Sequence, residues 1–402
     1  MRLLIVGGGH ASLPALADAR RWTGAGVAVT LLNDRPELWY SGMTPEWLGA
    51  VYTRMDVTVD LAALCAREGV ELVGGRAVRL DRENRRVETE DGRALSYDLA
   101  AFDVGGVNPG RDAAGPAVQT KPLHEIEALG AWLDETARAP APRRLAVVGG
   151  GAAGVEVALN VTARPDLDGR LHVTVISPDR ALLPAMPARA RRWAAATLRG
   201  RGVDLRLGER ADHVGDDALR LASGESVLAD RVLWATGSVG PPWLSNAGLA
   251  TDEAGFVRVD RGLRSLTDAR VFVAGDAAVV EGHEELARIG VHAVKQGPTL
   301  RTNLDRALEA LRDGRPLADA ALAPFRPYPV APLILSTGAR FALLVAGPVA
   351  LRGPLLLRLK HRVDRRWMAT YATRTPSYRS TWDARSARDL PARQPEAAVG
   401  TA

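Results

Sequence analysis

One arrangement of residues occurs twice in this 402-residue chain: a short apolar run that ends in three glycines. Residues 2–12 read RLLIVGGGHAS, and residues 144–154 read RLAVVGGGAAG. A helix-like stretch follows each copy, and then a second apolar run, VTLLNDR at 29–35 or VTVISPDR at 173–180. A strand, a glycine-rich turn, a helix and a second strand make up the unit that binds a dinucleotide pyrophosphate. The repeat therefore predicts an α/β fold with two Rossmann-like dinucleotide-binding domains.

The three small residues of such a turn serve different purposes. The first permits the tight turn, the second lets the backbone approach phosphate, and the third lets the helix pack on the strand. The N–H groups and the positive dipole end of the helix then face the anion. A chain with two such sites is most simply a flavoprotein that is reduced by a nicotinamide.

The bulk composition is that of a soluble globular protein, with 47% hydrophobic and 25% charged residues. The first predicted strand begins at Leu3, which leaves no room for a signal peptide. An apolar stretch at residues 341–351 is broken by Gly347 and Pro348 and is too short to span a bilayer. We therefore expect a cytoplasmic protein.

Cys65 is the only cysteine, so no disulfide can form within the chain. Disulfide reductases with two dinucleotide sites need a redox-active cysteine pair, and a persulfide relay is disfavoured for the same reason. Cys65 lies on the apolar side of a predicted helix, which favours a packing role over a reactive one. One cysteine and seven histidines form no cluster with metal-ligand spacing, so no metal site is expected.

Positive charge is concentrated near the C-terminus. Residues 351–402 contain eleven Lys or Arg against four Asp or Glu, whereas the whole chain has a net charge of only +5. A local basic element of this kind argues against a general nucleic-acid surface. Residues 355–371 resemble a cationic, amphipathic helix that contacts a membrane surface. Packing of its apolar face on its own domain, or on a second subunit of a homodimer, is the alternative. That face would hold Leu355, Leu356, Leu359, Val363, Trp367 and Tyr371.

The order of motifs predicts how the domains are arranged. A glycine–acid turn at Gly275 and Asp276 ends a third buried run, which indicates that the second dinucleotide domain is inserted into the first. We expect the first domain to comprise residues 1–115 and 255–320, and the second to comprise residues 116–254. A smaller C-terminal domain would cover 321–376, and 377–402 would form an unstructured tail.

With these motifs in place, the chain resembles the FAD-dependent pyridine nucleotide-disulfide oxidoreductases, and among them the type II NADH dehydrogenases. The resemblance rests on GGGHAS at 7–12, GGGAAGVE at 149–156, ATG at 235–237 and AGDAA at 274–278. A closer resemblance is to the NADH-dehydrogenase-like module associated with selenide, water dikinase. It rests on YSGMTPEWLGAVY at 40–52, GVHAVKQGPTLRTNL at 290–304, STGAR at 336–340 and RLKHRVDRRWM at 358–368.

The resemblance implies a set of FAD-binding residues. The turn would hold the pyrophosphate, the end of the second strand would hold the ribose, and the glycine–acid turn would hold the ribityl chain. The loop after the ribose-binding strand would cover the isoalloxazine ring. In that order, these residues are Gly7, Gly9 and Ser12; Asn33 and Asp34; Gly275 and Asp276; and Gly42 and Met43.

The resemblance also implies a nicotinamide site in the second domain. Its pyrophosphate-binding residues would be Gly149, Gly151 and Gly154, with Gly237 nearby. Ser177 stands where NAD enzymes carry an acid, and Arg180 follows it, which is also compatible with the phosphate of NADPH. The choice between NADH and NADPH is therefore open, and a solvated turn is an equal alternative.

Three residues are candidates for catalysis by this resemblance. Glu156 would lie near the junction of flavin and nicotinamide, and Lys295 and Gln296 would lie beside the flavin on the acceptor side. The predicted reaction is hydride transfer from NADH or NADPH to FAD, with electrons passing on to a quinone or another small acceptor. Two alternatives are a reductase linked to selenium metabolism and a flavin-binding sensor with a degenerate nicotinamide site.

Overall fold

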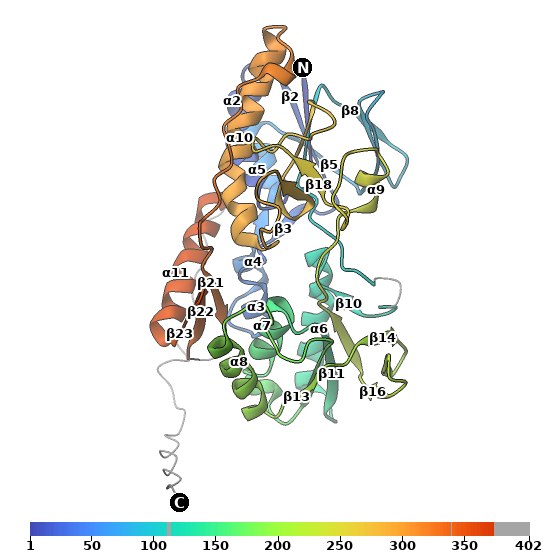
Figure 1. The fold of residues 1–402 in the computed structure, drawn as a ribbon, viewed down its shortest axis with the longest axis vertical. Coiled ribbons are helices and arrows are strands. Elements are labelled where there is room, and N and C mark those ends of the chain that lie inside the picture. The colour runs from blue at the N-terminus through green and yellow to red at the C-terminus, as the bar shows by residue number, and fades with distance from the viewer. Residues whose placement is uncertain (111–113, 339, 374–402) are drawn as a thin grey trace, which may run out of the picture.

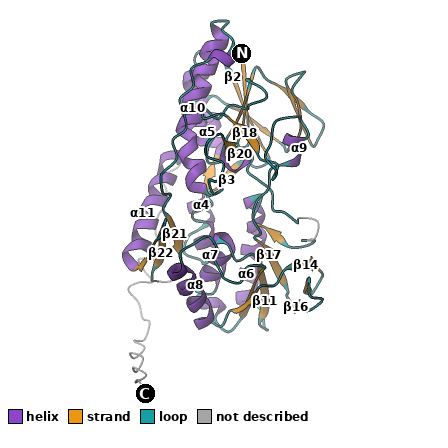
Figure 2. Cartoon of the chain, viewed as in Figure 1, coloured by secondary structure: helices purple, strands orange, loops and turns teal. Residues whose placement is uncertain are grey.

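Two parallel sheets form two lobes that are stacked along the long axis of the molecule (Figure 1). The computed structural model describes residues 1–110, 114–338 and 340–373. The long helices α10 (Gly290–Arg312) and α11 (Pro354–Tyr371) lie along one side of the lobes (Figure 2). The predicted α/β class with two dinucleotide-type sheets is confirmed. The tail predicted at 377–402 lies outside the described residues.

The first sheet has the strand order β19-β9-β1-β2-β5, and all of its pairings are parallel. β1 takes the centre because its run Leu3–Val6 is apolar and buried throughout. The edge strand β19 comes from a part of the chain that follows the whole second sheet. The strands are β1 (Arg2–Val6), β2 (Ala28–Asn33), β5 (Glu71–Gly74), β9 (Leu99–Phe102) and β19 (Val271–Val273).

The second sheet repeats this plan with the order β10-β17-β11-β12-β13, again parallel. Its central strand carries the second glycine-rich turn at its carboxyl end. The strands are β10 (Val118–Gln119), β11 (Arg143–Val148), β12 (Leu171–Ser177), β13 (Asp204–Leu207) and β17 (Arg231–Trp234). Its helices are α6 (Ile126–Arg138), α7 (Ala152–Val161) and α8 (Ala188–Gly200).

Smaller elements decorate both lobes. The first lobe carries the helices α1 (Leu13–Leu16), α2 (Arg20–Thr23), α3 (Thr44–Leu48), α4 (Arg54–Val57) and α5 (Leu61–Glu68). Its short strands are β3 (Glu37–Trp39), β4 (Thr58–Asp60), β6 (Ala77–Asp81), β7 (Arg86–Thr89), β8 (Ala94–Ser96), β18 (Val257–Val259) and β20 (Ala278–Val280). Also present are β14 (Ala211–Val214), β15 (Ala218–Leu221), β16 (Ser226–Leu228) and α9 (Pro242–Ser245).

The C-terminal part is an antiparallel sheet followed by α11. Its strands are β21 (Leu333–Ser336), β22 (Ala342–Ala346) and β23 (Val349–Gly353). The prediction of one continuous apolar face on α11 is wrong. Leu355, Leu359 and Val363 are 70%, 47% and 54% exposed. The buried face of α11 instead contains charged and polar side chains as well as apolar ones. Residues of the first lobe form hydrogen bonds with these polar side chains. The buried residues of α11 are Leu357, Lys360, His361, Asp364, Met368 and Tyr371.

One continuous apolar core runs through both lobes. Cys65 belongs to it and is 1% exposed, which confirms the predicted packing role. Among the described residues, no helix is long and apolar enough to cross a membrane.

Candidate functional site

The two glycine-rich turns share one backbone geometry. Gly7 N donates a hydrogen bond to Leu32 O at 2.9 Å, and Gly149 N donates to Ile176 O at 2.8 Å. Both glycines have positive φ, +88° and +128°. An added Cβ would lie 2.4 Å from Asp103 O at Gly7 and 2.3 Å from Ala235 O at Gly149. Each turn thus crosses the end of a neighbouring strand too closely for any side chain, as a cradle for a dinucleotide pyrophosphate requires.

Asn33 and Ser177, two of the residues predicted to bind ribose, lie beneath the two turns. Asn33 Oδ1 accepts a hydrogen bond from Gly8 N at 2.8 Å, and Asn33 Nδ2 donates to Arg35 O at 2.7 Å. Ser177 is fully buried, and an added Cβ at Gly150 would lie 2.7 Å from Ser177 Oγ. Asn33 thus holds the first turn by a hydrogen bond, whereas Ser177 packs against the second turn.

An exposed charged residue follows Asn33 in the first lobe, and another follows Ser177 in the second. Asp34 is exposed after Asn33, and its Oδ2 lies 3.9 Å from His124 Nδ1. Arg180 is exposed after Ser177. Gly237 O accepts a hydrogen bond from Asn108 Nδ2 at 3.1 Å, which fixes the loop opposite the second turn. Asp34 and Arg180 are thus the accessible charged groups among the predicted ribose-binding positions.

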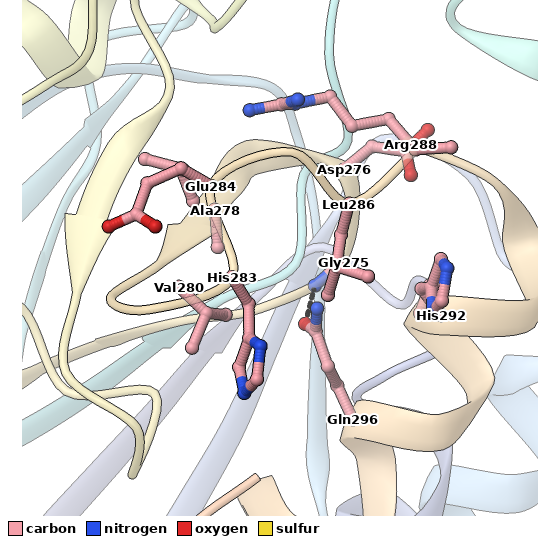
Figure 3. Close-up of a pocket in the computed structure, with 13 residues that line it drawn as sticks. Gly275, Asp276, Ala278, Val280, His283, Glu284, Leu286, Arg288, His292 and Gln296 are labelled. Atoms are coloured by element: carbon pink, nitrogen blue, oxygen red, sulfur yellow. Dashed lines mark hydrogen bonds between the residues drawn. The ribbon is translucent and has the colours of Figure 1, made fainter. Parts of the chain in front are cut away.

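The glycine–acid turn joins α10 to the first glycine-rich turn. Gly275 N donates to Gln296 Oε1 at 2.7 Å, as the dashed line in Figure 3 shows. Asp276 Oδ2 lies 2.6 Å from Lys121 Nζ, and the same ammonium group donates to Ser238 Oγ at 3.1 Å. Gln296 and Asp276 line one pocket and are held in place there by partners. These residues fit the ribityl part of FAD.

Lys295 does not join Gln296 in this pocket. Its Nζ lies 4.7 Å from the centre of the Tyr328 ring, in a cation–π contact on the outer side of α10. Tyr328 is 44% exposed. Successive residues of a helix point about 100° apart, so the two predicted partners diverge.

A buried cluster of charged side chains connects α11 with the first lobe. Lys360 is 5% exposed and donates hydrogen bonds to Glu46 Oε2 at 2.9 Å, to Asp364 Oδ2 at 2.8 Å and to Gly42 O. Glu46 is fully buried in α3, and its Oε1 lies 3.7 Å from His361 Nδ1. His361 in turn contacts the hydroxyl of Tyr52. We refer to Lys360, Glu46, Asp364, His361 and Tyr52 as the buried cluster.

Glu156 lies beside the buried cluster and belongs to the second lobe. Its Oε1 accepts a hydrogen bond from Ser336 N at 2.7 Å. Burial, aided by the nearby Glu46, raises the pKa of Glu156 to about 8, although Lys360 opposes the shift. Burial alone would lower the pKa of Lys360, but the surrounding carboxylates hold it well above its usual range. Burial thus favours the protonated form of Glu156 at neutral pH, and the carboxylates favour the charged form of Lys360.

The loop at 40–43 is held by an aromatic stack. The rings of Tyr40 and Trp367 are 4.3 Å apart at an angle of 22°, and His10 lies 5.5 Å from Trp367 at 26°. Tyr40 also donates its hydroxyl to Asp364 Oδ1 at 3.0 Å. Met43 is fully buried beneath. The first turn, this loop and α11 thus meet in one wall, at the place where the sequence predicts the isoalloxazine ring.

Several residues of this site were not identified from the sequence. Lys121, Lys360, Glu46 and Asp103 lie outside the glycine motifs, and their burial depends on contacts between distant segments. One signal was present: this chain has 52 basic residues, of which only Lys121, Lys295 and Lys360 are lysine. The two lysines that were passed over both form buried or half-buried ion pairs.

Comparison with known proteins identifies the family. The sequence profile described as pyridine nucleotide-disulphide oxidoreductase matches residues 1–303. The chain belongs to this family. Its members are oxidoreductases that bind FAD and NAD(P)H.

Individual relatives act on different acceptors, as their names state. A demethylphylloquinone reductase of Synechocystis sp. is 25% identical, over 90% of this chain and 91% of that protein. The ferredoxin–NAD(+) reductase component of the p-cumate 2,3-dioxygenase system of Pseudomonas putida is 30% identical, over 69% and 67%. Among solved structures, the sulfide:quinone oxidoreductase of Aquifex aeolicus has a TM-score of 0.69 at 17% identity and covers 95% of this chain and 94% of its own. That likeness supports the fold.

Proposed function

We propose that this oxidoreductase passes electrons from NAD(P)H, through FAD, to a quinone-type acceptor on the α11 side of the flavin. The observation that carries the proposal is the buried cluster with Glu156 beside it. Reduction of a quinone to a quinol consumes two electrons and two protons, whereas a one-electron iron–sulfur acceptor takes up no proton. Buried groups that hold protons at neutral pH therefore favour a quinone over a ferredoxin.

The overall reaction is NAD(P)H + H⁺ + quinone → NAD(P)⁺ + quinol. When bound, FAD accepts the hydride and releases the electrons, and the protein supplies orientation and protons. Gln296 and Asp276 would orient the ribityl chain, with Lys121 holding Asp276. Glu156 would hold a proton near the acceptor, and Lys360 would hold the loop at Gly42 and the side chains of Glu46 and Asp364 in place. We assign no step to Lys295, because its ammonium group contacts Tyr328.

A first experiment separates donor and acceptor. The purified yellow protein is titrated anaerobically with NADH and then with NADPH while the flavin absorbance is followed. Bleaching by either is expected, and the rate with each gives the preference that Ser177 and Arg180 leave open. The reduced protein is then mixed with a soluble menaquinone analogue or with an oxidised ferredoxin. Rapid reoxidation by the quinone alone is expected.

The opposite pattern would overturn the assignment of the acceptor. Reoxidation by ferredoxin and not by quinone would make this protein a reductase of the type seen in Pseudomonas putida. An absence of bleaching by both nicotinamides would favour the sensor alternative.

We also propose that the exposed stripe of α11 docks on an anionic membrane surface, where quinones reside. Leu355, Leu359 and Val363 recur at every fourth residue and are exposed. Beside them, Arg358, Arg362 and Arg366 are exposed at the same spacing. Apolar residues flanked by arginine fit an interfacial helix. Association with vesicles that contain anionic lipid, lost when the three apolar residues are replaced by Ser, would support docking. Dimerisation through this stripe instead would appear as a doubled mass in solution.

A link to selenium metabolism is a second proposal, because two of the motifs behind that resemblance meet in the structure. Residues 40–52 contribute Tyr40, Glu46 and Tyr52, and residues 358–368 contribute the side chains that they contact. Contact between these two segments is what supports the proposal. Turnover of NAD(P)H that depends on a selenium compound would support the link, and equal turnover in its absence would remove it.

A further inference from the structure

Asp103 is a buried acid that packs against the first glycine-rich turn. It follows β9 directly and is 6% exposed. Its Oδ2 accepts hydrogen bonds from Ser12 N at 2.8 Å and from Ser12 Oγ at 3.0 Å. An added Cβ at Gly9 would lie 2.5 Å from Asp103 Cγ, and one at Gly275 would lie 2.3 Å from Asp103 Oδ1. The carboxyl group thus fills the space between the two segments that would hold the FAD pyrophosphate and ribityl chain.

The second lobe has no counterpart of this acid. The register of the central strands makes Ala235 the equivalent of Asp103, and the glycine pattern makes Gly154 the equivalent of Ser12. The second turn keeps the same backbone geometry without a carboxyl or a hydroxyl group at these two positions. The fold of such a turn therefore does not require Asp103, and its presence at the first turn calls for another explanation.

The charge of Asp103 opposes the binding of a dinucleotide. A pyrophosphate is anionic and is held by backbone N–H groups of the turn. Asp103 already accepts from one of these groups, Ser12 N, and would lie close to the bound anion. Like charges in a water-poor site disfavour the ionised carboxyl group, so the protonated form is favoured once the anion is bound.

We propose that Asp103 is a proton-binding group beside the FAD pyrophosphate, so that FAD binding is coupled to proton uptake and weakens as the pH rises. The proposal rests on FAD occupying the first turn. When the cofactor binds, Asp103 takes one proton from water. When that proton is lost, the carboxylate and the pyrophosphate compete for the same amide groups.

The electrostatic surroundings place this transition near neutrality. Burial raises the pKa of Asp103 to about 7, the hydrogen bonds from Ser12 oppose the shift, and Asp276 adds to it. Burial lowers the pKa of His10 to about 4, so this side chain is neutral throughout the relevant range. Three other charged or titratable groups near the turn interact electrostatically with Asp276. They are Lys121, Arg288 and His292.

The test measures FAD affinity against pH. The holoprotein is diluted at a series of pH values between 6 and 9, and released FAD is followed by its fluorescence. For the wild type we expect the dissociation constant to rise by up to about tenfold per pH unit above neutrality, as the binding of one proton requires. Asp103→Asn keeps the shape and an acceptor oxygen for Ser12 N, and its FAD affinity should not vary with pH.

Two further variants isolate the charge from folding. Asp103→Ala copies the second lobe and should also be independent of pH. Asp91→Asn, at an exposed acid in the β7–β8 hairpin that pairs with Arg93, should keep the wild-type slope. The wild-type slope is itself a test if the variants fold poorly.

A wild-type affinity that is constant between pH 6 and 9 would overturn the coupling while leaving FAD binding intact. The same slope in Asp103→Asn as in the wild type would overturn the assignment to Asp103. A protein that retains no FAD at any pH would overturn both this inference and the proposed function.

Discussion

The two lobes place the same turn on the same kind of sheet, yet they surround it with different chemistry. At the first turn, Ser12 and Asp103 form a buried polar pair, and Asn33 braces the backbone by a hydrogen bond. At the second turn, Gly154 and Ala235 stand in the same places, and Ser177 lies beneath. We therefore expect the backbone to determine that a dinucleotide can bind, and the residues beneath the turn to determine how tightly and at which pH.

The lobes also differ in what covers them. The loop after β2 in the first lobe is held by α11 through Tyr40, Glu46 and Gly42. The second lobe packs against the same region through α6 and α7, and Glu156 of α7 lies beside the buried cluster. A cofactor that stays bound fits the covered lobe, and a nicotinamide that exchanges at each turnover fits the other.

The largest expected effect comes from a matched pair of glycine substitutions. Gly7→Val and Gly149→Val each put a side chain against strand backbone at a positive φ. Strain of roughly 3 kcal/mol would weaken the corresponding dinucleotide about 100-fold or more. Gly7→Val should purify without FAD, whereas Gly149→Val should be yellow but slow to bleach with NAD(P)H. Flavin absorbance decides both. If both variants lost FAD, the two turns would not be independent sites.

The second largest effect is expected from the buried cluster that connects α11 with the first lobe. Lys360→Met would leave Glu46 and Asp364 buried without their cation, which costs on the order of 3–5 kcal/mol. Denaturant unfolding should show this loss. A triple variant, Lys360→Met with Glu46→Gln and Asp364→Asn, removes the unpaired charges and should recover part of it. A loss below about 1 kcal/mol for Lys360→Met alone would mean that water reaches the cluster.

A smaller effect is expected in the pH dependence of electron transfer to the quinone. Glu156 is protonated below about pH 8, so the reoxidation rate of the reduced flavin should fall as the pH rises through 8. Glu156→Gln should lower the rate at neutral pH by about tenfold and remove the dependence. Stopped-flow absorbance measures it. Reduction by NAD(P)H serves as the internal control, since it should change little, and an unaltered profile in Glu156→Gln would exclude Glu156 as the proton source.

The raised pKa of Glu156 also affects stability, with a defined sign. The folded state holds this proton up to about pH 8, whereas an unfolded carboxyl group loses it near pH 4. Between these values the folded state binds more protons, so the free energy of unfolding should decrease as the pH rises.

The smallest expected effect comes from truncating Asn33 and Ser177, whose side chains lie beneath the two turns. Asn33→Ala removes the hydrogen bond from Gly8 N and the one to Arg35 O, and should cost about 1 kcal/mol or more. Ser177→Ala removes only the long contact of 3.3 Å from Asp179 N and should cost less than about 0.5 kcal/mol. Thermal unfolding of the two variants, with and without added FAD, measures the difference. Equal losses would show that the second turn depends on Ser177 in some other way.

Sequence patterns predicted those parts of this molecule that are local. The glycine turns, the central strands and the buried Cys65 follow from short-range periodicity and from the conformations that only glycine adopts. The hydrogen bond between Asn33 and Gly8 N did not follow, because a small polar residue at a strand end can face either a ribose or the turn above it. The sequence also did not predict that α11 exposes apolar residues on one side and buries charged residues on the other. The charges on its buried side are tolerated only because residues 40–52, some 300 positions away, supply their partners.

The position of β19 in the chain has a consequence for the order of assembly. All five strands of the second sheet lie between residues 118 and 234, so that sheet can form as soon as this stretch is available. The first sheet begins with β1 but is completed only by β19 (Val271–Val273). The predicted FAD site also includes Asp276 and Gln296, which come later still in the chain. Contacts between segments so far apart form late. The nicotinamide lobe should therefore mature before the flavin lobe during synthesis, and capture of FAD would mark the completion of the fold.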